Sequence, residues 1–82
     1  MAGGINIRNV SSGNCHVFVS KYTNKSASDD WYTIPVAQRE SWQRNGWELV
    51  AFKNDADTER AGKYVRVDST VTFTSLGNIE VS

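Results

Sequence analysis

The dipeptide Asn45-Gly46 stands between two runs that are rich in apolar and aromatic residues. Asparagine and glycine both tolerate the positive φ angles of a two-residue turn, so this pair is the strongest short-range signal for a β-hairpin. Because side chains alternate along a strand, such a turn would place Trp42, Arg44 and Trp47 on one face of the hairpin. The sequence therefore predicts a hairpin that gathers two tryptophans and a guanidinium beside one tight turn.

The rest of the chain also divides into short runs with the period-two alternation of half-buried strands, separated by polar turn residues. No stretch shows sustained helical periodicity, although segment 54–62 has room for one helical turn ended by Gly62. Short strands with turn signals between them indicate an all-β fold, a small antiparallel β-sandwich without a long helix. The expected strands are 5–10, 15–22, 31–34, 41–44, 47–52, 63–67, 70–74 and 79–81.

Length, charge and cysteine content limit the classes of protein to which the chain can belong. The 82 residues predict one domain, 1–82, and nine basic against nine acidic residues leave no net charge to attract nucleic acid. Cys15 is the single cysteine, so no internal disulfide can form. The chain opens without a signal peptide and has no long apolar span, which predicts a cytoplasmic protein. A small domain without disulfide bonds gains stability from self-association, so we expect a homodimer or a higher homo-oligomer.

Catalytic and metal-binding patterns are weak. His16 is predicted to be an ordinary strand residue and Cys15 a small buried group, since no further cysteine or histidine completes a metal site. The acidic run 55–59 resembles a fragment of a calcium loop, but a charged surface loop with an aspartate paired to Arg60 explains it better. We therefore predict no enzyme activity, no catalytic residues, no metal and no cofactor. The predicted core is Ile5, Ile7, Val17, Phe18, Val19, Ile34, Leu49, Phe52, Tyr64, Val65, Val67, Val71 and Phe73.

The tryptophans suggest a ligand. Trp31, Trp42 and Trp47 each adjoin a loop or turn and have charged neighbours. A protein holds a sugar with an aromatic plate against its C–H face and with polar groups around its hydroxyls. An alternative is that Trp42 and Trp47 pack across the strand pair with a guanidinium stacked on Trp47. The candidate carbohydrate-binding residues are Asp30, Trp31, Trp42, Arg44, Asn45, Trp47, Asn54 and Asp55.

The whole chain also resembles a known family. The segments that carry the resemblance are Ile5 to Ser11, Val17 to Tyr22, Trp31 to Ile34, Trp42 to Glu48 and Arg60 to Val65. They are similar to the small cytoplasmic lectins of mushroom fruiting bodies, in particular the α-galactosyl-binding type. The resemblance implies a β-sandwich that self-associates, displays several glycan sites and serves in defence of the fungus. The chain departs from this pattern at Val36-Ala37-Gln38, where a glycine turn would be expected after Pro35.

The sequence thus predicts a non-enzymatic lectin, an agglutinin that recognises glycan ends, galactosyl ends by resemblance, and reaches membranes only through glycolipids. Oligomerisation would supply several sites, which raises avidity. Two alternatives remain: a membrane-active, aegerolysin-like or pore-forming module whose tryptophans enter the lipid interface, and a structural domain whose aromatics bind a protein surface. A glycosidase that uses paired carboxylates is the weakest alternative.

Overall fold

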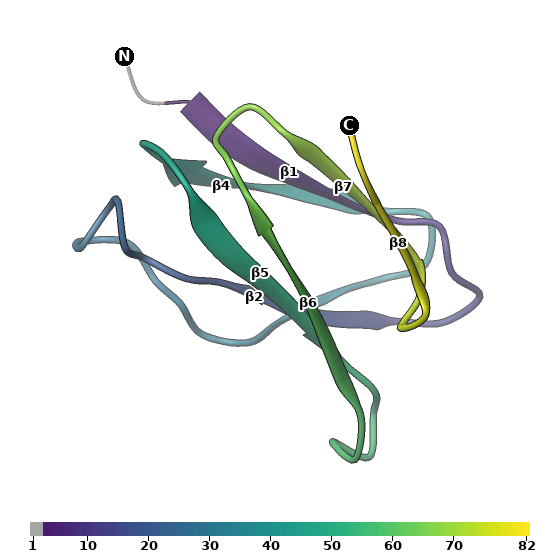
Figure 1. Ribbon diagram of the computed structural model, residues 1–82. Coiled ribbons are helices and arrows are strands. Elements are labelled where there is room, and N and C mark those ends of the chain that lie inside the picture. The colour runs from purple at the N-terminus through teal and green to yellow at the C-terminus, as the bar shows by residue number, and fades with distance from the viewer. Residues whose placement is uncertain (1–2) are drawn as a thin grey trace.

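The computed structural model describes residues 3–82, and these form eight strands in two layers (Figure 1). No helix within the described residues could cross a membrane. The sequence prediction of an all-β fold is confirmed. The strands are β1 (Gly3–Asn9), β2 (Cys15–Val19), β3 (Tyr32–Ile34), β4 (Arg39–Arg44), β5 (Glu48–Lys53), β6 (Arg60–Val65), β7 (Thr70–Ser75) and β8 (Asn78–Val81).

Each layer is a sheet of four strands. The first sheet has the order β4-β1-β7-β8 and the second the order β3-β2-β5-β6. All neighbouring strands are antiparallel except β1 and β7, which run parallel. The predicted antiparallel β-sandwich thus contains one parallel pairing. This pairing could not be foreseen from spacing alone, because β1 and β7 lie at opposite ends of the sequence.

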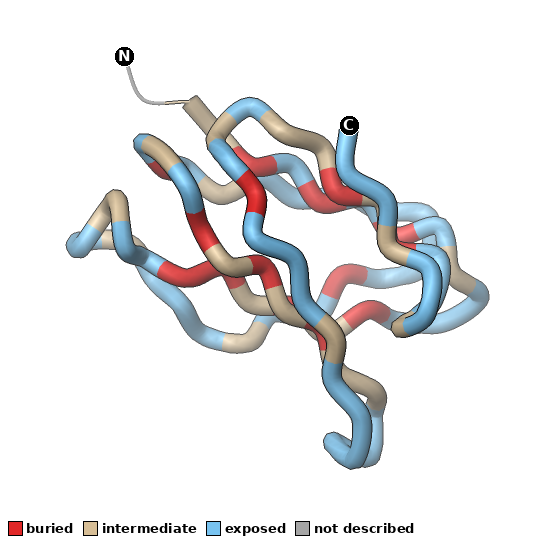
Figure 2. The backbone as a smooth tube through the Cα atoms, in the orientation of Figure 1, coloured by how far each residue is buried: buried red, intermediate tan, exposed pale blue. Residues whose placement is uncertain are grey.

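The core lies between the two sheets and follows the alternation of the sequence. In β1, Ile5 and Ile7 are fully buried while Asn6 and Arg8 are exposed. Figure 2 shows the same alternation in both layers, with buried positions along the strands and exposed ones in most of the turns. The buried hydrophobic residues are Ile5, Ile7, Cys15, Val17, Val19, Ile34, Val50, Phe52, Val65, Val71 and Phe73.

The predicted hairpin around Asn45-Gly46 does not form. Strand β4 pairs with β1 in the first sheet, whereas β5 pairs with β2 and β6 in the second, so the turn carries the chain from one sheet to the other. Neither residue of the dipeptide has a positive φ. Instead the backbone N–H of Asn45 donates to the hydroxyl of Thr23, 2.9 Å away, so this turn docks on a distant loop rather than folding back on itself.

Three residues predicted to be core lie on the outer face of the second sheet. Leu49 and Phe18 are half-buried there and Tyr64 is 62% exposed. The register explains this, since Leu49 is opposite Tyr64 and both leave β5 and β6 on the side away from the buried Val50 and Phe52. Strand β5 is apolar on both faces, and alternation cannot tell which face of such a strand is buried.

Two turns also differ from expectation. Gly62 lies inside β6 rather than at the end of a helical turn, and residues 54–59 form a turn between β5 and β6. After Pro35 the chain makes a tight turn in which the N–H of Gln38 donates to the Pro35 carbonyl over 3.2 Å. Ala37 takes the positive φ of 63° there, a position at which glycine is preferred.

Candidate functional site

The side chain of Glu48, the first residue of β5, is buried at one end of the sandwich. One carboxylate oxygen accepts hydrogen bonds from the Ser20 hydroxyl at 2.5 Å and from the Tyr22 N–H at 2.9 Å. The other accepts from the N–H and the hydroxyl of Thr23 at 2.8 and 2.5 Å. All four donors come from the polar segment that follows β2, so this carboxylate fixes the beginning of a loop.

Arg44, the last residue of β4, is 1% exposed and lies beside Glu48, with its Nε 3.9 Å from the carboxylate. Its guanidinium donates to the carbonyls of Val19 at 3.0 Å, Ser20 at 2.7 Å and Ser28 at 2.8 Å. A further N–H donates to the adjacent Gln43 carbonyl at 2.8 Å. We call these contacts of Arg44 and Glu48 the Arg44–Glu48 network.

Both charges are held in their ionised forms by these contacts. Burial raises the pKa of Glu48, but the hydrogen bonds from Ser20, Thr23 and Tyr22 outweigh it, so this pKa lies below its ordinary value. Burial lowers the pKa of Arg44, while the charges of Glu48 and Asp29 oppose this shift. A buried charge of this kind is stable only when its hydrogen bonds are satisfied. Within residues 3–82 no buried side-chain nitrogen or oxygen is left without a partner.

The network holds the loop of residues 20–28, here called the 20–28 loop, against the end of β4. Asn45 adds to it, since its side-chain N–H donates to the Thr23 carbonyl at 2.8 Å. The side chain of Asn24 in turn donates to the Gln43 carbonyl at 3.2 Å. A polar loop with no secondary structure of its own is thereby attached at Ser20, Thr23, Asn24 and Ser28.

A hollow of about 350 Å³ lies between this loop and β4. Strand β4 is the edge of its sheet, so the hollow follows an open strand edge. Trp42 supplies the large apolar wall, and its ring meets the edge of the Tyr32 ring at 5.8 Å. The lining residues, which define the Trp42 hollow, are Asn24, Ser26, Ala27, Ser28, Ser41, Trp42, Gln43 and Arg44.

Chemically, the Trp42 hollow offers one indole and a set of hydroxyl and amide groups. The indole is anchored, because Trp42 is half-buried and packs against the hydrophobic core. Arg44 also lines the hollow, and its guanidinium donates four hydrogen bonds to backbone carbonyls, so it is engaged in holding the loop. Its contact with a ligand stays a prediction.

Trp42, Arg44 and Asn45 are the predicted site residues that the structure brings together here. Trp31, Asn54 and Asp55 lie toward the opposite end of β5. There the Trp31 ring packs on Phe18 at 4.8 Å, with the Lys53 ammonium 4.4 Å from its centroid.

Asn54 is occupied with shaping the turn after β5, since its side chain bonds Thr58 and the N–H of Glu59. In the same turn Arg60 donates two hydrogen bonds to Asp57, at 2.9 and 3.0 Å. These bonds are the main reason that the pKa of Asp57 lies below its ordinary value. The predicted pairing of an aspartate with Arg60 is confirmed.

Trp47 lies apart from both groups, whereas Asp30 contacts Ser28, a lining residue of the Trp42 hollow. Trp47 is half exposed and stacks on Tyr64, with ring centroids 5.3 Å apart. The alternative in which Arg44 stacks on Trp47 is not formed, because the buried guanidinium donates to backbone carbonyls of the 20–28 loop and of β2. Asp30 is exposed in the segment before β3 and accepts a 3.2 Å hydrogen bond from the Ser28 hydroxyl.

His16 has partners that the sequence did not suggest. Its Nδ1 lies 3.0 Å from the Thr33 hydroxyl and its Nε2 contacts the Asp55 carboxylate. The three groups have the order of a hydroxyl–imidazole–carboxylate triad. They lie outside the Trp42 hollow, however, and the Asp55 side chain is 88% exposed. The His16 side chain is 22% exposed, so the carboxylate is the open end of this row.

Sequence reasoning missed the polar half of the hollow, namely Asn24, Ser26, Ser28, Ser41 and Gln43. The available signal was the composition of segment 20–28, which is long and polar for a connection in so small a domain. Loops of this kind carry function more often than the strands that they join.

No group of histidine, cysteine, aspartate or glutamate side chains suited to hold a metal ion occurs within the described part of the chain. Comparison with protein-family models gives no match, and neither a curated protein nor a solved structure matches the chain.

Proposed function

We propose that this chain is a non-enzymatic carbohydrate-binding protein and that the Trp42 hollow binds one sugar ring. The observation that carries the proposal is the pairing of an anchored indole with a polar loop around one concave space. A sugar presents an apolar C–H face and a rim of hydroxyls, and it needs these two kinds of surface side by side.

The Arg44–Glu48 network supports this proposal through preorganisation. A loop that is already ordered loses little conformational entropy when a ligand binds, so a small polar ligand gains affinity. The 20–28 loop is ordered by two buried charges, an arrangement that core packing alone does not require. Removal of the network is therefore expected to weaken binding even where the sugar touches neither charge.

Galactosyl specificity, an oligomeric lectin that agglutinates cells, a role in fungal defence and a cytoplasmic location belong to the same proposal and rest on the resemblance described above. A single shallow site gives a dissociation constant of ~1 mM, which is about 4 kcal/mol. Two or more linked sites raise avidity by ~10²–10⁴, so agglutination requires an assembly.

The test compares two tryptophans that receive the same substitution. Trp42→Leu keeps an apolar group against the core but removes the indole plate, and we expect the dissociation constant for a galactose-terminated disaccharide to rise about tenfold. Trp47→Leu removes an exposed indole outside the hollow and should change it by less than about twofold. Binding is measured by calorimetry, after a glycan array and a haemagglutination assay have selected the sugar.

Gln43→Ala and Ser26→Ala provide a second route if Trp42→Leu does not fold, since both side chains are exposed on the hollow. Each should weaken binding about threefold, the effect of one partly exposed hydrogen bond. A folded wild-type protein that binds no glycan would refute the proposal. Equal losses in Trp42→Leu and Trp47→Leu would refute the placement of the site.

A protein-binding role is the second candidate, and one observation favours it. Trp47 and Tyr64 form a stacked pair on the outer face of the second sheet, with exposed fractions of 50% and 62%. Exposed aromatics of this kind are frequent anchors in protein interfaces. Capture of a partner that is lost in Trp47→Ala and is unaffected by free sugars would support this role.

A further inference from the structure

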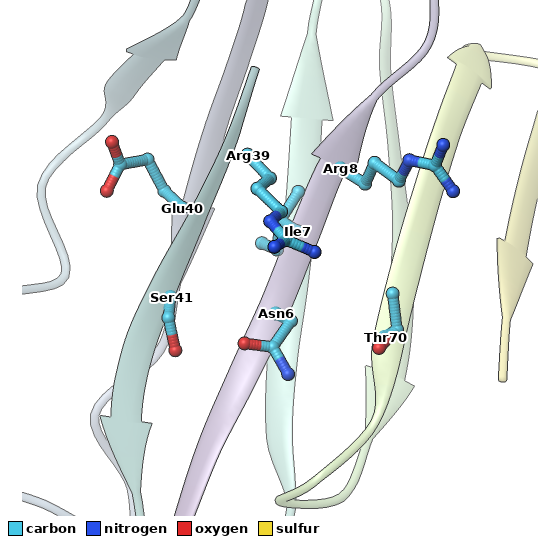
Figure 3. Close-up of a pocket in the computed structure, with 7 residues that line it drawn as sticks. All are labelled: Asn6, Ile7, Arg8, Arg39, Glu40, Ser41 and Thr70. Atoms are coloured by element: carbon cyan, nitrogen blue, oxygen red, sulfur yellow. The ribbon is translucent and has the colours of Figure 1, made fainter. Parts of the chain in front are cut away.

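A second hollow, of about 420 Å³, lies on the outer face of the first sheet. It spans β4, β1 and β7, and Figure 3 shows its lining residues. We call it the Arg8–Arg39 hollow, because Arg8 of β1 and Arg39 of β4 are directly opposite each other in the antiparallel pairing. The lining residues are Asn6, Ile7, Arg8, Arg39, Glu40, Ser41 and Thr70.

The two arginines form an unusual pair, because like charges opposite each other on neighbouring strands destabilise a sheet. Neither arginine forms an ion pair with any carboxylate of residues 3–82. In a chain with equal numbers of acidic and basic residues, two arginines at paired positions of adjacent strands and without an ion-pair partner are available for an external anion.

The one carboxylate of the hollow does not neutralise them. Glu40 is opposite the buried Ile7, so its side chain leaves β4 toward the other face. Figure 3 shows its carboxylate turned away from both guanidinium groups. The Tyr32 hydroxyl donates to it over 3.4 Å. The hollow therefore presents its cations on one side, with the polar side chains of Asn6 and Thr70 beside them.

The two hollows meet at the free edge of β4, where Ser41 lines both of them. Trp42 leaves β4 on the same face as Glu40, since each is opposite a buried isoleucine of β1, so a ligand that reaches from Trp42 to Arg39 passes around this edge. Successive residues of a strand are 3.2–3.4 Å apart, so a ligand of two or three sugar rings is long enough to reach from Trp42 to Arg39.

We propose that the Arg8–Arg39 hollow binds an acidic substituent, a carboxylate or a sulfate ester, of a glycan whose neutral ring occupies the Trp42 hollow. This inference rests on the proposed carbohydrate-binding function and names its ligand class as acidic oligosaccharides. Guanidinium groups suit it because their planar N–H pairs match the two oxygens of a carboxylate or a sulfate.

The experiment compares three probes that share one neutral core: lactose, 3′-sulfated lactose and 3′-sialylated lactose. Calorimetry should show that the wild-type protein binds an acidic form about tenfold more tightly than lactose. The double variant Arg8→Gln/Arg39→Gln should bind all three probes equally, while its affinity for lactose stays that of the wild type. Higher ionic strength should reduce the preference, because the charges are exposed and screened by salt.

Lys63→Gln is the matched control, since it removes one exposed positive charge from β6 in the other sheet. It should keep the full preference, whereas Arg39→Gln alone should lose part of it. Tighter binding of either acidic probe supports the inference and identifies which substituent is preferred.

Two results separate the inference from the function on which it rests. Equal affinity of the wild type for all three probes, or a preference that survives in the double variant, would overturn the inference and leave the sugar site intact. If the folded wild type binds none of the probes and no other glycan, the carbohydrate-binding function itself fails.

Discussion

The two ends of the sandwich are each closed by a buried polar network, but the two networks differ in charge. At the end of β1, the buried Asn9 side chain donates to the carbonyls of Gly13 at 2.9 Å and Ile34 at 2.9 Å, and it accepts from Ser11. At the start of β1, Gly3 is opposite Arg44, where the Arg44–Glu48 network begins. One end is neutral and the other contains a carboxylate and a guanidinium.

The charge of each network matches the backbone groups that it has to satisfy. The Asn9 network joins a short turn to the end of β3, and a neutral amide suffices for this because it both donates and accepts. The Arg44–Glu48 network orders a longer loop, in which backbone N–H groups at Tyr22 and Thr23 and the carbonyls of Ser20 and Ser28 all need partners. An acceptor-only carboxylate and a donor-only guanidinium meet the two needs separately.

The largest effect is expected from Glu48→Ala. This change removes four hydrogen bonds and leaves the buried Arg44 charge without its partner, and breaking a buried pair costs about 3–5 kcal/mol. That is a large part of the ~4–12 kcal/mol expected for an 82-residue domain. Urea denaturation followed by tryptophan fluorescence measures the loss.

Glu59→Ala is the matched control, because this glutamate is exposed in the turn between β5 and β6. Its effect should stay within ~0.5 kcal/mol, as for surface substitutions in general. A Glu48→Ala protein as stable as the Glu59→Ala protein would show that the network does not hold this end of the sandwich.

A smaller effect is expected from Asn9→Ala. It leaves the buried carbonyl of Ile34 and the turn at Ser11 without partners, at a cost of about 2 kcal/mol. Asn14→Ala, at an exposed position of the same connection, should be close to neutral. Sugar affinity should remain unchanged in both, since the Asn9 network lies at the end away from the Trp42 hollow. Loss of binding in Asn9→Ala would mean that the two ends are coupled.

The smallest effect is the pH dependence of the unfolding free energy. It distinguishes the two ends because Glu48 titrates and Asn9 does not. The pKa of Glu48 is lower in the folded than in the unfolded state. The stabilisation of the fold by ionised Glu48 is therefore complete above the pKa of the unfolded chain, about 4.3. It is lost as the pH falls through the folded value, because the unfolded chain binds the proton more readily. Each unit of depression contributes about 1.4 kcal/mol.

Unfolding free energies measured from pH 7 downward test this. The wild type and Asn9→Ala should lose stability in parallel below pH ~4.3, whereas Glu48→Gln should have a flatter profile. Asp57 contributes in the same direction, and Asp57→Asn measures its share. Identical profiles for wild type and Glu48→Gln would show that Glu48 does not titrate differently on folding.

Much of the fold could be predicted from the sequence because alternation is a local property. A few positions are enough to predict a strand and its buried face, as with Ile5 and Ile7 in β1 and Val17 and Val19 in β2. Trp42 could be singled out as a candidate because an indole next to a turn is unusual at the level of the sequence, and the structure places it in the wall of a hollow. Asp57 and Arg60 pair at a separation of three residues, so their contact was also predictable.

The pairing of strands and the composition of the site could not be predicted in this way. The Asn45-Gly46 signal describes a turn but not which sheet follows it. In the structure this turn is hydrogen-bonded to Thr23, more than twenty residues away in the chain. Arg44 was expected to be a ligand-binding group. The residues next to it in the sequence do not reveal that its guanidinium bonds the distant carbonyls of Val19 and Ser28.

Local chemistry, then, was enough to establish an all-β chain of short strands, its main buried residues and the presence of an indole beside a turn. Only the packed molecule decided that β4 and β5 enter different sheets, that Arg44 and Glu48 are buried, and that the 20–28 loop and Ser41 complete a hollow around Trp42. The physical reason is range: alternation and turn preference act over a few residues, whereas burial and hydrogen bonding of charged groups depend on partners brought together by the whole fold.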